Sequence, residues 1–308
     1  MADGSVGGVS TRPSLGLGLA VAFTLLAWAS AFVVIRGLGH SIDGGALAVG
    51  RLLVGTAALG ELLLVSRRWM RPTSREWLLL LVYGVGWFGC YNVALNLAEQ
   101  VLDAGTTAMI VGIGPILIAV GSGLVLHERI GRWLGAGLGV AFLGVVLIAL
   151  ADGARFTDLP GMLGAVAAAV TYAIGVVAQK PLVSRLPGIQ VTFLGCAIGL
   201  VVCLPFAPVL VRELAAAPTV AWLGVVYLGV VPTALAFTTW AYALQRMNPA
   251  ALGITTYVVP VLVVVIALLA FREFPHPVAV AGGVICLLGV AISRRRSRVV
   301  RVAEVDRV

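Results

Sequence analysis

The chain has 308 residues, of which 60% are hydrophobic and only 11% are charged. Its mean hydropathy of +1.07 excludes an ordinary soluble domain, because such a domain needs a polar surface. The net charge of +8 is explained by basic connectors at one membrane face, so no nucleic-acid partner is expected. Composition therefore predicts an all-α polytopic membrane protein surrounded by a lipid bilayer.

A helix that crosses a membrane needs about twenty mostly apolar residues, and ten such runs follow one another along the chain. We expect transmembrane helices at 15–36, 45–65, 77–97, 104–126, 132–150, 162–182, 189–209, 219–242, 250–271 and 277–293. A cytoplasmic segment 1–14 precedes them, a linker 151–161 divides them, and a basic tail 294–308 follows them. The connectors are too short to hold a soluble module.

Basic residues occur mainly in alternate connectors. One side of the membrane would hold Arg12, Arg67, Arg68, Arg71, Arg75, Arg129, Arg132, Lys180, Arg185, Arg246 and the tail 294–308. The other side would hold only Arg36, Arg155, Arg212 and Arg272. Because Lys and Arg are retained in cytoplasmic connectors, we predict that both termini are cytoplasmic and that the basic loops and tail attract anionic lipid.

Two segments carry the same pair of residues at the same separation. Pro115 precedes Glu128 by thirteen residues, and 145 residues later Pro260 precedes Glu273 by thirteen. A match over two helix-length segments indicates a duplicated chain. The predicted repeats hold five helices each and cover 15–150 and 162–293. Because five is odd, the second repeat would enter the membrane inverted, an arrangement that provides for alternating access.

The two prolines lie near the middle of their spans. A proline inside a helix removes a backbone hydrogen bond and frees carbonyls about one turn earlier, here near Val111 and Gly112. Inside a membrane, freed carbonyls need a neighbour, water or a ligand. We therefore expect a hinge or gate at Pro115, Pro260, Gly112 and Gly253. The alternative is a tolerated kink without any ligand contact.

Aromatic residues mark one face of the third span. Tyr83, Trp87 and Tyr91 recur every four residues, whereas Asn92 and Asn96 fall on the other side of the same helix. The helical period therefore predicts an aromatic face and a separate amide face.

The eighth span is divided in a similar way. Trp240 lies on one face, and Thr238, Tyr242 and Gln245 lie on the opposite one. At an offset of 149 residues Tyr91 corresponds to Trp240, and the amide of Asn96 corresponds to that of Gln245. A duplicated aromatic position and a duplicated amide position would suit an uncharged or zwitterionic organic molecule.

The segments 104–144 and 253–289, each with a mid-helix proline and a terminal glutamate before a glycine-rich helix, resemble the two repeats of the drug/metabolite transporter superfamily, EamA type. Arg51 in the second span and Tyr91-Asn92 in the third fit the same pattern. Within the superfamily, the chain is similar to the bacterial amino-acid exporters of the YddG type. This resemblance implies export of aromatic or other neutral amino acids across a bacterial inner membrane.

The chain departs from the repeat pattern at two positions. At an offset of 144 residues Trp28 corresponds to Tyr172, so one tryptophan is not duplicated. No counterpart of Arg51 is apparent in the seventh span. Arg51 is the best candidate for an embedded charge, and an intramembrane charge is a functional candidate, although its long side chain can also extend to the nearer interface.

The substrate site is expected among the deeper aromatic and polar side chains of spans one, three, four, six, eight and nine, with spans five and ten peripheral. Candidate substrate-binding residues are Trp28, Tyr83, Trp87, Tyr91, Asn92, Asn96, Tyr172, Thr238, Trp240, Tyr242, Gln245, Thr256 and Tyr257. Aromatic rings pack on apolar ligands but also attract cations. A multidrug exporter for aromatic cations therefore stays open, as does a non-transport membrane enzyme or assembly protein.

Two further features are assigned to structure. Glu128 and Glu273 begin the connectors before spans five and ten, where a carboxylate can cap the next helix. Gly131, Gly135 and Gly139 recur every four residues and permit close helix contact, either within the chain or in a homodimer. The four cysteines have no metal-ligand spacing, so no metal is expected. No cofactor and no catalytic residue are expected either.

Overall fold

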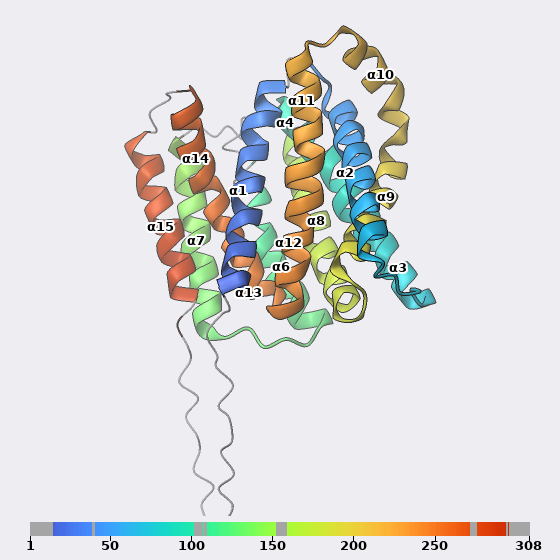
Figure 1. Cartoon of the computed structure of the whole chain (residues 1–308). Coiled ribbons are helices and arrows are strands. Elements are labelled where there is room, and N and C mark those ends of the chain that lie inside the picture. The colour runs from blue at the N-terminus through green and yellow to red at the C-terminus, as the bar shows by residue number, and fades with distance from the viewer. Residues whose placement is uncertain are drawn as a thin grey trace, which may run out of the picture.

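The computed structural model describes residues 15–38, 41–101, 107, 110–151, 159–271, 276–293 and 295. These residues form helices that pack side by side into one bundle, with no strand among them (Figure 1). The expected all-helical architecture is therefore observed. Glu273, the segment 1–14, residues 152–158 of the linker and the tail apart from Arg295 lie outside the described residues.

The two halves of the chain contain a similar series of elements. The first half contains α1 (Leu15–Leu38), α2 (Gly44–Ser66), α3 (Ser74–Tyr83), η1 (Gly84–Cys90), α4 (Tyr91–Val101), α6 (Gly114–Val125) and α7 (Arg132–Ala151). The second half contains α8 (Leu159–Arg185), α9 (Gly188–Cys203), η2 (Leu204–Phe206), α10 (Ala207–Ala216), α11 (Thr219–Leu228), η3 (Gly229–Leu235), α12 (Ala236–Arg246), α13 (Pro249–Gly253), η4 (Ile254–Tyr257), α14 (Val258–Phe271) and α15 (Pro277–Ser293).

Seven helical stretches among the described residues are long and apolar enough to cross a membrane. They are Leu15–Ile35, Gly44–Ser66, Ser74–Ala98, Leu159–Arg185, Gly188–Ala216, Thr219–Arg246 and Pro249–Ile266. Shorter apolar helices at Gly114–Val125, Arg132–Ile148 and Pro277–Ser293 lie within the fourth, fifth and tenth predicted runs. Each predicted run thus contains a helix, and the described residues provide seven of full spanning length.

The third and eighth spans each contain a seven-residue π-helix. These elements are η1 and η3, and the second begins 145 residues after the first. Pro115 and Pro260 are separated by the same number of residues. A π-helix is rare and usually marks a functional position, so its occurrence at equivalent places in both halves supports the duplication.

This register corrects the offset of 149 residues expected for these spans. With 145 residues between η1 and η3, Trp240 corresponds to Leu95 and not to Tyr91. The expectation assumed regular α-helices. A π-helix has more residues per turn, so side chains on either side of it no longer follow one helical period.

The contacts of the two π-helices identify the counterpart of Arg51. In one half Gly229 of η3 lies so near the Arg51 carbonyl that a Cβ would be 2.9 Å from it. In the other half a Cβ on Gly84 of η1 would lie at the same distance, 2.9 Å, from the carbonyl oxygen of Gly195. Gly195 is therefore the counterpart of Arg51, and the Tyr83 ring fills the space where a side chain would start.

Helices α7 and α15 pack directly backbone against backbone. A Cβ on Gly144 would lie 2.5 Å from the backbone nitrogen of Cys286, and Gly289 is as tightly enclosed. Gly135 and Gly139 have no atom within 4 Å of such a Cβ. The close helix contact therefore uses different glycines from the stripe that the sequence suggested.

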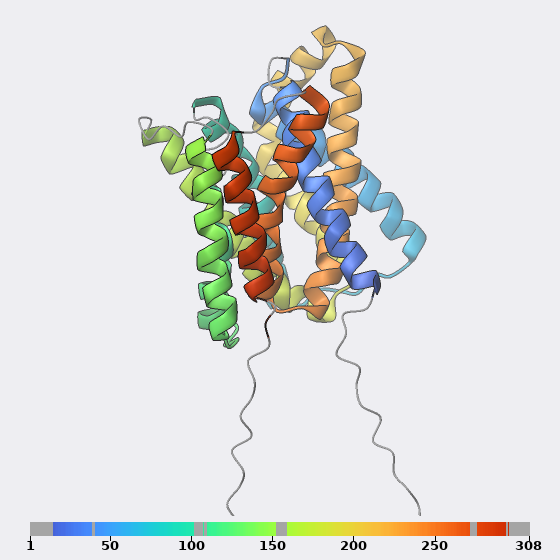
Figure 2. The same ribbon diagram turned by 90° about the vertical axis from the view of Figure 1, so that its left-hand side faces the viewer.

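The first and last described helices mark one end of the bundle. Helix α1 begins and α15 ends at the same end of the bundle, the lower one in Figures 1 and 2. We call this the terminal end. Helix α10 lies at the opposite end, beside the beginning of α2 (Figure 1).

Candidate functional site

A cavity of about 150 Å³ lies inside the bundle. Its walls come from the six spans expected to form the pathway, and α2 and α7 add one residue each. The lining residues are Trp28, Ala31, Phe32, Ile35, Arg51, Trp87, Tyr91, Asn92, Leu95, Thr107, Val111, Gly112, Pro115, Val145, Tyr172, Phe237, Thr256, Tyr257, Val259 and Pro260.

The cavity lies between the middle of the bundle and the end opposite the terminal end. Helix α1 runs away from the terminal end, and its lining residues, from Trp28 to Ile35, are in its second half. Helix α2 runs back, and its lining residue Arg51 is in its first half. Both helices therefore place the cavity in the same half of the bundle.

A cluster of aromatic rings closes the cavity toward the terminal end. The Trp28 and Trp240 rings are 4.9 Å apart, the Trp87 and Phe237 rings are also 4.9 Å apart, and Trp87 lies 5.1 Å from Tyr172. Rings at these distances attract one another beyond simple area burial. We call this cluster the aromatic floor. Trp240 is 1% exposed and does not line the cavity, so its side chain lies on the terminal side of the floor.

Arg51 is held at the cavity wall by a residue of the other repeat. Its Nε and one terminal nitrogen donate to Thr233 Oγ1 at 3.2 and 3.1 Å. Thr233 in turn donates to the carbonyl of Leu228 at 2.7 Å, just before the π-helix η3. Thr233 thus holds the Arg51 guanidinium at the cavity wall. The Arg51 side chain therefore does not have to extend to the membrane interface to find a polar partner.

Two hydroxyl groups in the cavity wall have no hydrogen-bond partner among the described residues. They are Oγ1 of Thr107 and the phenol oxygen of Tyr172, both on buried side chains. Buried polar groups nearly always have a partner. A polar ligand or water in the cavity would supply what these two hydroxyls lack.

Both proline-containing spans are interrupted beside the cavity. Residues 112–113 form a turn before α6, and η4 is a 3-10 segment between α13 and α14. The carbonyl of Gly112 accepts a hydrogen bond from Tyr257 at 2.7 Å, and these two residues are 145 apart. Pro115 and Pro260 line the cavity, whereas Gly253 is buried outside it. Freed backbone groups are therefore satisfied across the repeat boundary.

The predicted separation of aromatic and amide faces in the third span is wrong. Tyr91 and Asn92 both line the cavity, and the Asn92 amide donates to the Phe88 carbonyl at 2.7 Å. Tyr83 is instead buried outside it and accepts a hydrogen bond from Gln179 at 2.9 Å. The π-helix between Tyr83 and Tyr91 accounts for the different directions of these two residues, because it rotates one part of the helix relative to the other.

Four further candidates lie away from the cavity. The Asn96 amide donates to the Gly44 carbonyl at 2.5 Å, and the Thr238 hydroxyl donates to Ala234 at 2.7 Å. The Arg246 guanidinium stacks 3.7 Å from the Tyr242 ring centre and donates to Gln245 at 3.2 Å. Asn96 is thus bonded to α2, and the other three side chains are bonded within their own helix, which a helical period alone does not reveal.

Sequence reasoning missed several contributors to the cavity, including the following three. Phe32 and Thr107 line it, and Thr233 positions Arg51. Thr233 follows Pro232 inside the eighth span, so that proline was an available signal of irregular backbone. The two π-helices themselves had only a weak signal, the glycines of 84–89.

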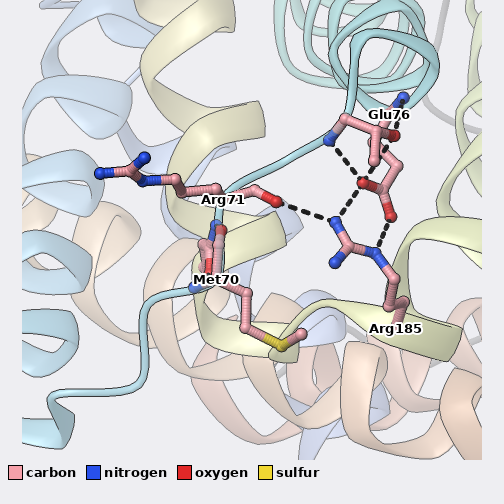
Figure 3. A network of polar contacts seen from close by, with 6 residues as sticks. Met70, Arg71, Glu76 and Arg185 are labelled. Atoms are coloured by element: carbon pink, nitrogen blue, oxygen red, sulfur yellow. Dashed lines mark hydrogen bonds and ion pairs between the residues drawn. The ribbon is translucent and has the colours of Figure 1, made fainter.

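Polar contacts join the two repeats at the terminal end. Figure 3 shows Arg185, the last residue of α8, reaching the carboxylate of Glu76 near the start of α3 with both Nε and a terminal nitrogen. The same terminal nitrogen donates to the Arg71 carbonyl at 3.0 Å. The first and second repeats are thereby joined at this end.

Glu128 takes part in a second contact between the repeats. Its carboxylate accepts a hydrogen bond from the Asn248 amide, and Asn248 Oδ1 caps α13 by accepting from the N–H of Ala250 at 2.9 Å. The Lys180 ammonium donates to the carbonyl of Met247 at 2.8 Å. Glu128 therefore contacts the cap at the start of α13, rather than the following helix α7 as expected, and its structural role stays a prediction.

We expect the stability contribution of Glu128 to depend on pH. Burial raises the pKa of this loop carboxyl above its ordinary value of 4.5, and the nearby Lys180 ammonium opposes the rise. A raised folded-state pKa gives a contribution that is fully present below the unfolded pKa and is lost as pH rises through the folded one. Thermal unfolding of wild type and Glu128→Gln is measured from about pH 4 to 8. As the pH rises, wild type should lose stability relative to the variant. A pH-independent difference would contradict this.

The fold and its apolar helices together define a multi-pass helical membrane protein with an internal cavity. A family model described as the EamA-like transporter family matches residues 15–150 and again 159–295. The chain belongs to this family. Its family and the names of its relatives indicate a transporter rather than an enzyme.

Several curated relatives are similar over most of the chain. It is 34% identical over 285 residues to a probable terminal-alkyne amino-acid exporter of Streptantibioticus cattleyicolor, covering 90% of this chain and 93% of the relative. It is 32% identical to an uncharacterized transporter, YdfC, of Bacillus subtilis over 86% of this chain and 87% of the relative. It is 26% identical to the aromatic amino acid exporter YddG of Ancylobacter novellus over 70% and 76%.

A solved crystal structure shares the fold, with a TM-score of 0.74, 22% sequence identity, and coverage of 90% of this chain and 96% of that one. Together with its apolar helices and its bacterial relatives, membership of this transporter family identifies the chain as a multi-pass protein of the inner membrane. A small-molecule substrate and a surrounding lipid bilayer are implied by the same membership.

Proposed function

We propose that this protein is a ten-span carrier that exports small amino acids with apolar or aromatic side chains by alternating access. The observation that carries the substrate class is Arg51. Its guanidinium stands at the wall of a cavity whose other described lining residues carry no charge. A carboxylate is the natural partner of a guanidinium, since two parallel charge-assisted hydrogen bonds fit its planar shape.

The rest of the cavity suits the remainder of an amino acid. Trp28, Phe32 and Phe237 provide apolar surface for a side chain. The hydroxyls of Thr107 and Tyr172, which lack partners, can accept hydrogen bonds from an ammonium group. Two of the relatives are named as a probable terminal-alkyne amino-acid exporter and as an aromatic amino acid exporter, which supports a substrate with an amino-acid head and an uncharged side chain.

The size of the cavity favours a small solute over a drug. Its volume of about 150 Å³ is similar to that of an engineered cavity that admits benzene. Sites for drug-sized ligands are larger, about 300–1,000 Å³. The conformation described here thus has room for a compact molecule in contact with the aromatic floor.

The distribution of basic residues supports cytoplasmic termini. At the terminal end lie Arg67, Arg68, Arg71, Arg75, Arg129, Arg132, Arg185, Arg246 and Arg295, all in or beside connectors. At the opposite end the described residues in or beside connectors and in α10 include only Arg36, near the end of α1, and Arg212. Because basic residues are retained in the cytoplasm, the terminal end is cytoplasmic in this proposal and the cavity lies on the external side of the aromatic floor.

The multidrug alternative has less support. A permanently charged aromatic cation could stack on the rings, but it would have to enter a cavity that holds Arg51 and no carboxylate among its described lining residues. Like charges at short distance repel strongly where water is excluded. Arg51 therefore favours an anionic or zwitterionic head group.

The proposal is tested by flux into proteoliposomes that contain only this protein. Neutral aromatic and short apolar amino acids should move, whereas their amides, which lack the carboxylate, and quaternary aromatic cations should move at least about tenfold more slowly, as loss of a charge-assisted contact predicts. Each solute is measured with and without a pH gradient. Movement of cations alone would establish the drug-exporter reading, and absence of flux for every solute would refute transport of this class.

A further inference from the structure

Repeat symmetry assigns to some cavity residues a counterpart that lies outside the present cavity. At the offset of 144 residues that relates Trp28 to Tyr172, Ile35 corresponds to Gln179. At the offset of 145 residues that relates the two π-helices, Leu95 corresponds to Trp240. Ile35 and Leu95 line the present cavity, whereas Gln179 and Trp240 do not.

Gln179 and Trp240 lie toward the terminal end and are closed off in this structure. Their exposed fractions are 0% and 1%. Helix α8 runs toward the terminal end, and Gln179 is seven residues beyond the lining residue Tyr172. In α12 Trp240 is three residues beyond the lining residue Phe237. Both side chains therefore lie one to two turns below the cavity.

Each of these two residues carries a polar atom that has no partner among the described residues. They are Oε1 of Gln179 and Nε1 of Trp240. The Gln179 amide nitrogen is occupied by the Tyr83 hydroxyl at 2.9 Å, but its oxygen is not. Leaving a buried polar atom unpaired is costly, and the equivalent positions Ile35 and Leu95 show that an apolar residue fits this fold.

We propose that Gln179 and Trp240 form the cytoplasm-facing contact for the transported amino acid, in the conformation where the terminal end is open. This inference rests on the proposed alternating-access function. In an inverted repeat, the residues that line one cavity are equivalent to those that line the other when the halves exchange packing. The Gln179 oxygen then accepts a hydrogen bond from the ammonium group, and the Trp240 indole N–H donates to the carboxylate.

The test is reaction of single cysteines with a membrane-impermeant thiol reagent added from the cytoplasmic side. The background replaces Cys90, Cys196, Cys203 and Cys286, which are free thiols. Gln179→Cys should react at least about tenfold faster than Leu182→Cys. Both positions are 0% exposed here, but Leu182 is closer to the terminal end, and its counterpart Leu38 does not line the cavity.

Val176→Cys provides a second reporter in case Gln179→Cys folds poorly. Val176 is 0% exposed, and its counterpart Phe32 lines the cavity, so it should also react from the cytoplasmic side. Saturating amino acid substrate should slow both reactions. Equal rates at Leu182 and at both reporters, or rates that the amino acid does not change, would overturn the proposed contact.

A functional measurement separates this inference from the proposed function itself. Gln179→Leu and Trp240→Phe should raise the half-saturation concentration on the cytoplasmic side about three- to tenfold, as loss of one hydrogen bond predicts. For Gln179→Leu the external half-saturation concentration should not change. Normal values on both sides would sink the inference while leaving amino-acid transport intact, whereas failure of wild type to move any amino acid would refute the function.

Discussion

Arg51→Met should raise the external half-saturation concentration for neutral amino acids by about 10- to 150-fold. The substitution removes the one charged group among the described cavity-lining residues. A hydrogen bond to a charged group contributes about 1.5–3 kcal/mol, and each 1.4 kcal/mol changes an equilibrium about tenfold. Concentration-dependent uptake in proteoliposomes measures the effect, with protein amount and monodispersity checked by size-exclusion chromatography.

Two controls separate recognition of the carboxylate from general damage. Arg212→Met removes an exposed arginine near the opposite end of the bundle and should leave the half-saturation concentration unchanged. Residual flux of amino-acid amides should be insensitive to Arg51→Met, because these solutes have no carboxylate. If acids and amides lose transport equally, Arg51 acts only through its contact with Thr233, as part of the structure.

Gly144→Val should sharply reduce the amount of folded protein. A Cβ on Gly144 would stand 2.5 Å from the backbone nitrogen of Cys286 in α15, and backbone atoms of a packed helix cannot move aside as a side chain can. Forcing extra atoms into a packed interface costs about 1–3 kcal/mol, and more where backbones must separate. Helices α7 and α15 would be pushed apart. The yield of monodisperse protein and its thermal unfolding temperature measure the loss.

Gly139→Val is the matched control on the same helix. No atom lies within 4 Å of a Cβ at Gly139, and the change from glycine to valine has the same effect on helix propensity at both sites. This variant should fold as well as wild type. Equal loss at Gly139 would mean that valine is not tolerated in α7 for reasons other than contact with α15, or that Gly139 faces a second copy of the chain.

The spans and their order were predictable because they depend on local composition. A run of about twenty apolar residues has few alternatives to a membrane helix. The duplication was also visible, since Pro115 and Pro260 stand at the same offset as the two π-helices found in the structure. Family membership followed from the same residues and agrees with the matched family model.

The composition of the cavity was predictable only in part. Trp28, Tyr91, Tyr172 and Tyr257 were selected as deep aromatic residues, and all four line it. Trp240 was selected by the same reasoning, but it lies outside the cavity. Their depth followed from position along a span, whereas their direction depended on helical phase, which the π-helices alter.

The sequence by itself determined the class of this protein, through the length and apolar character of its segments and their repetition. Only the tertiary structure decided which polar groups meet. The Arg51 guanidinium is held by Thr233, and the Gly112 carbonyl accepts from Tyr257, each pair joining residues of different repeats. Such contacts depend on how two distant helices face each other, and a buried polar group takes the partner that folding brings near rather than one that is near in the chain.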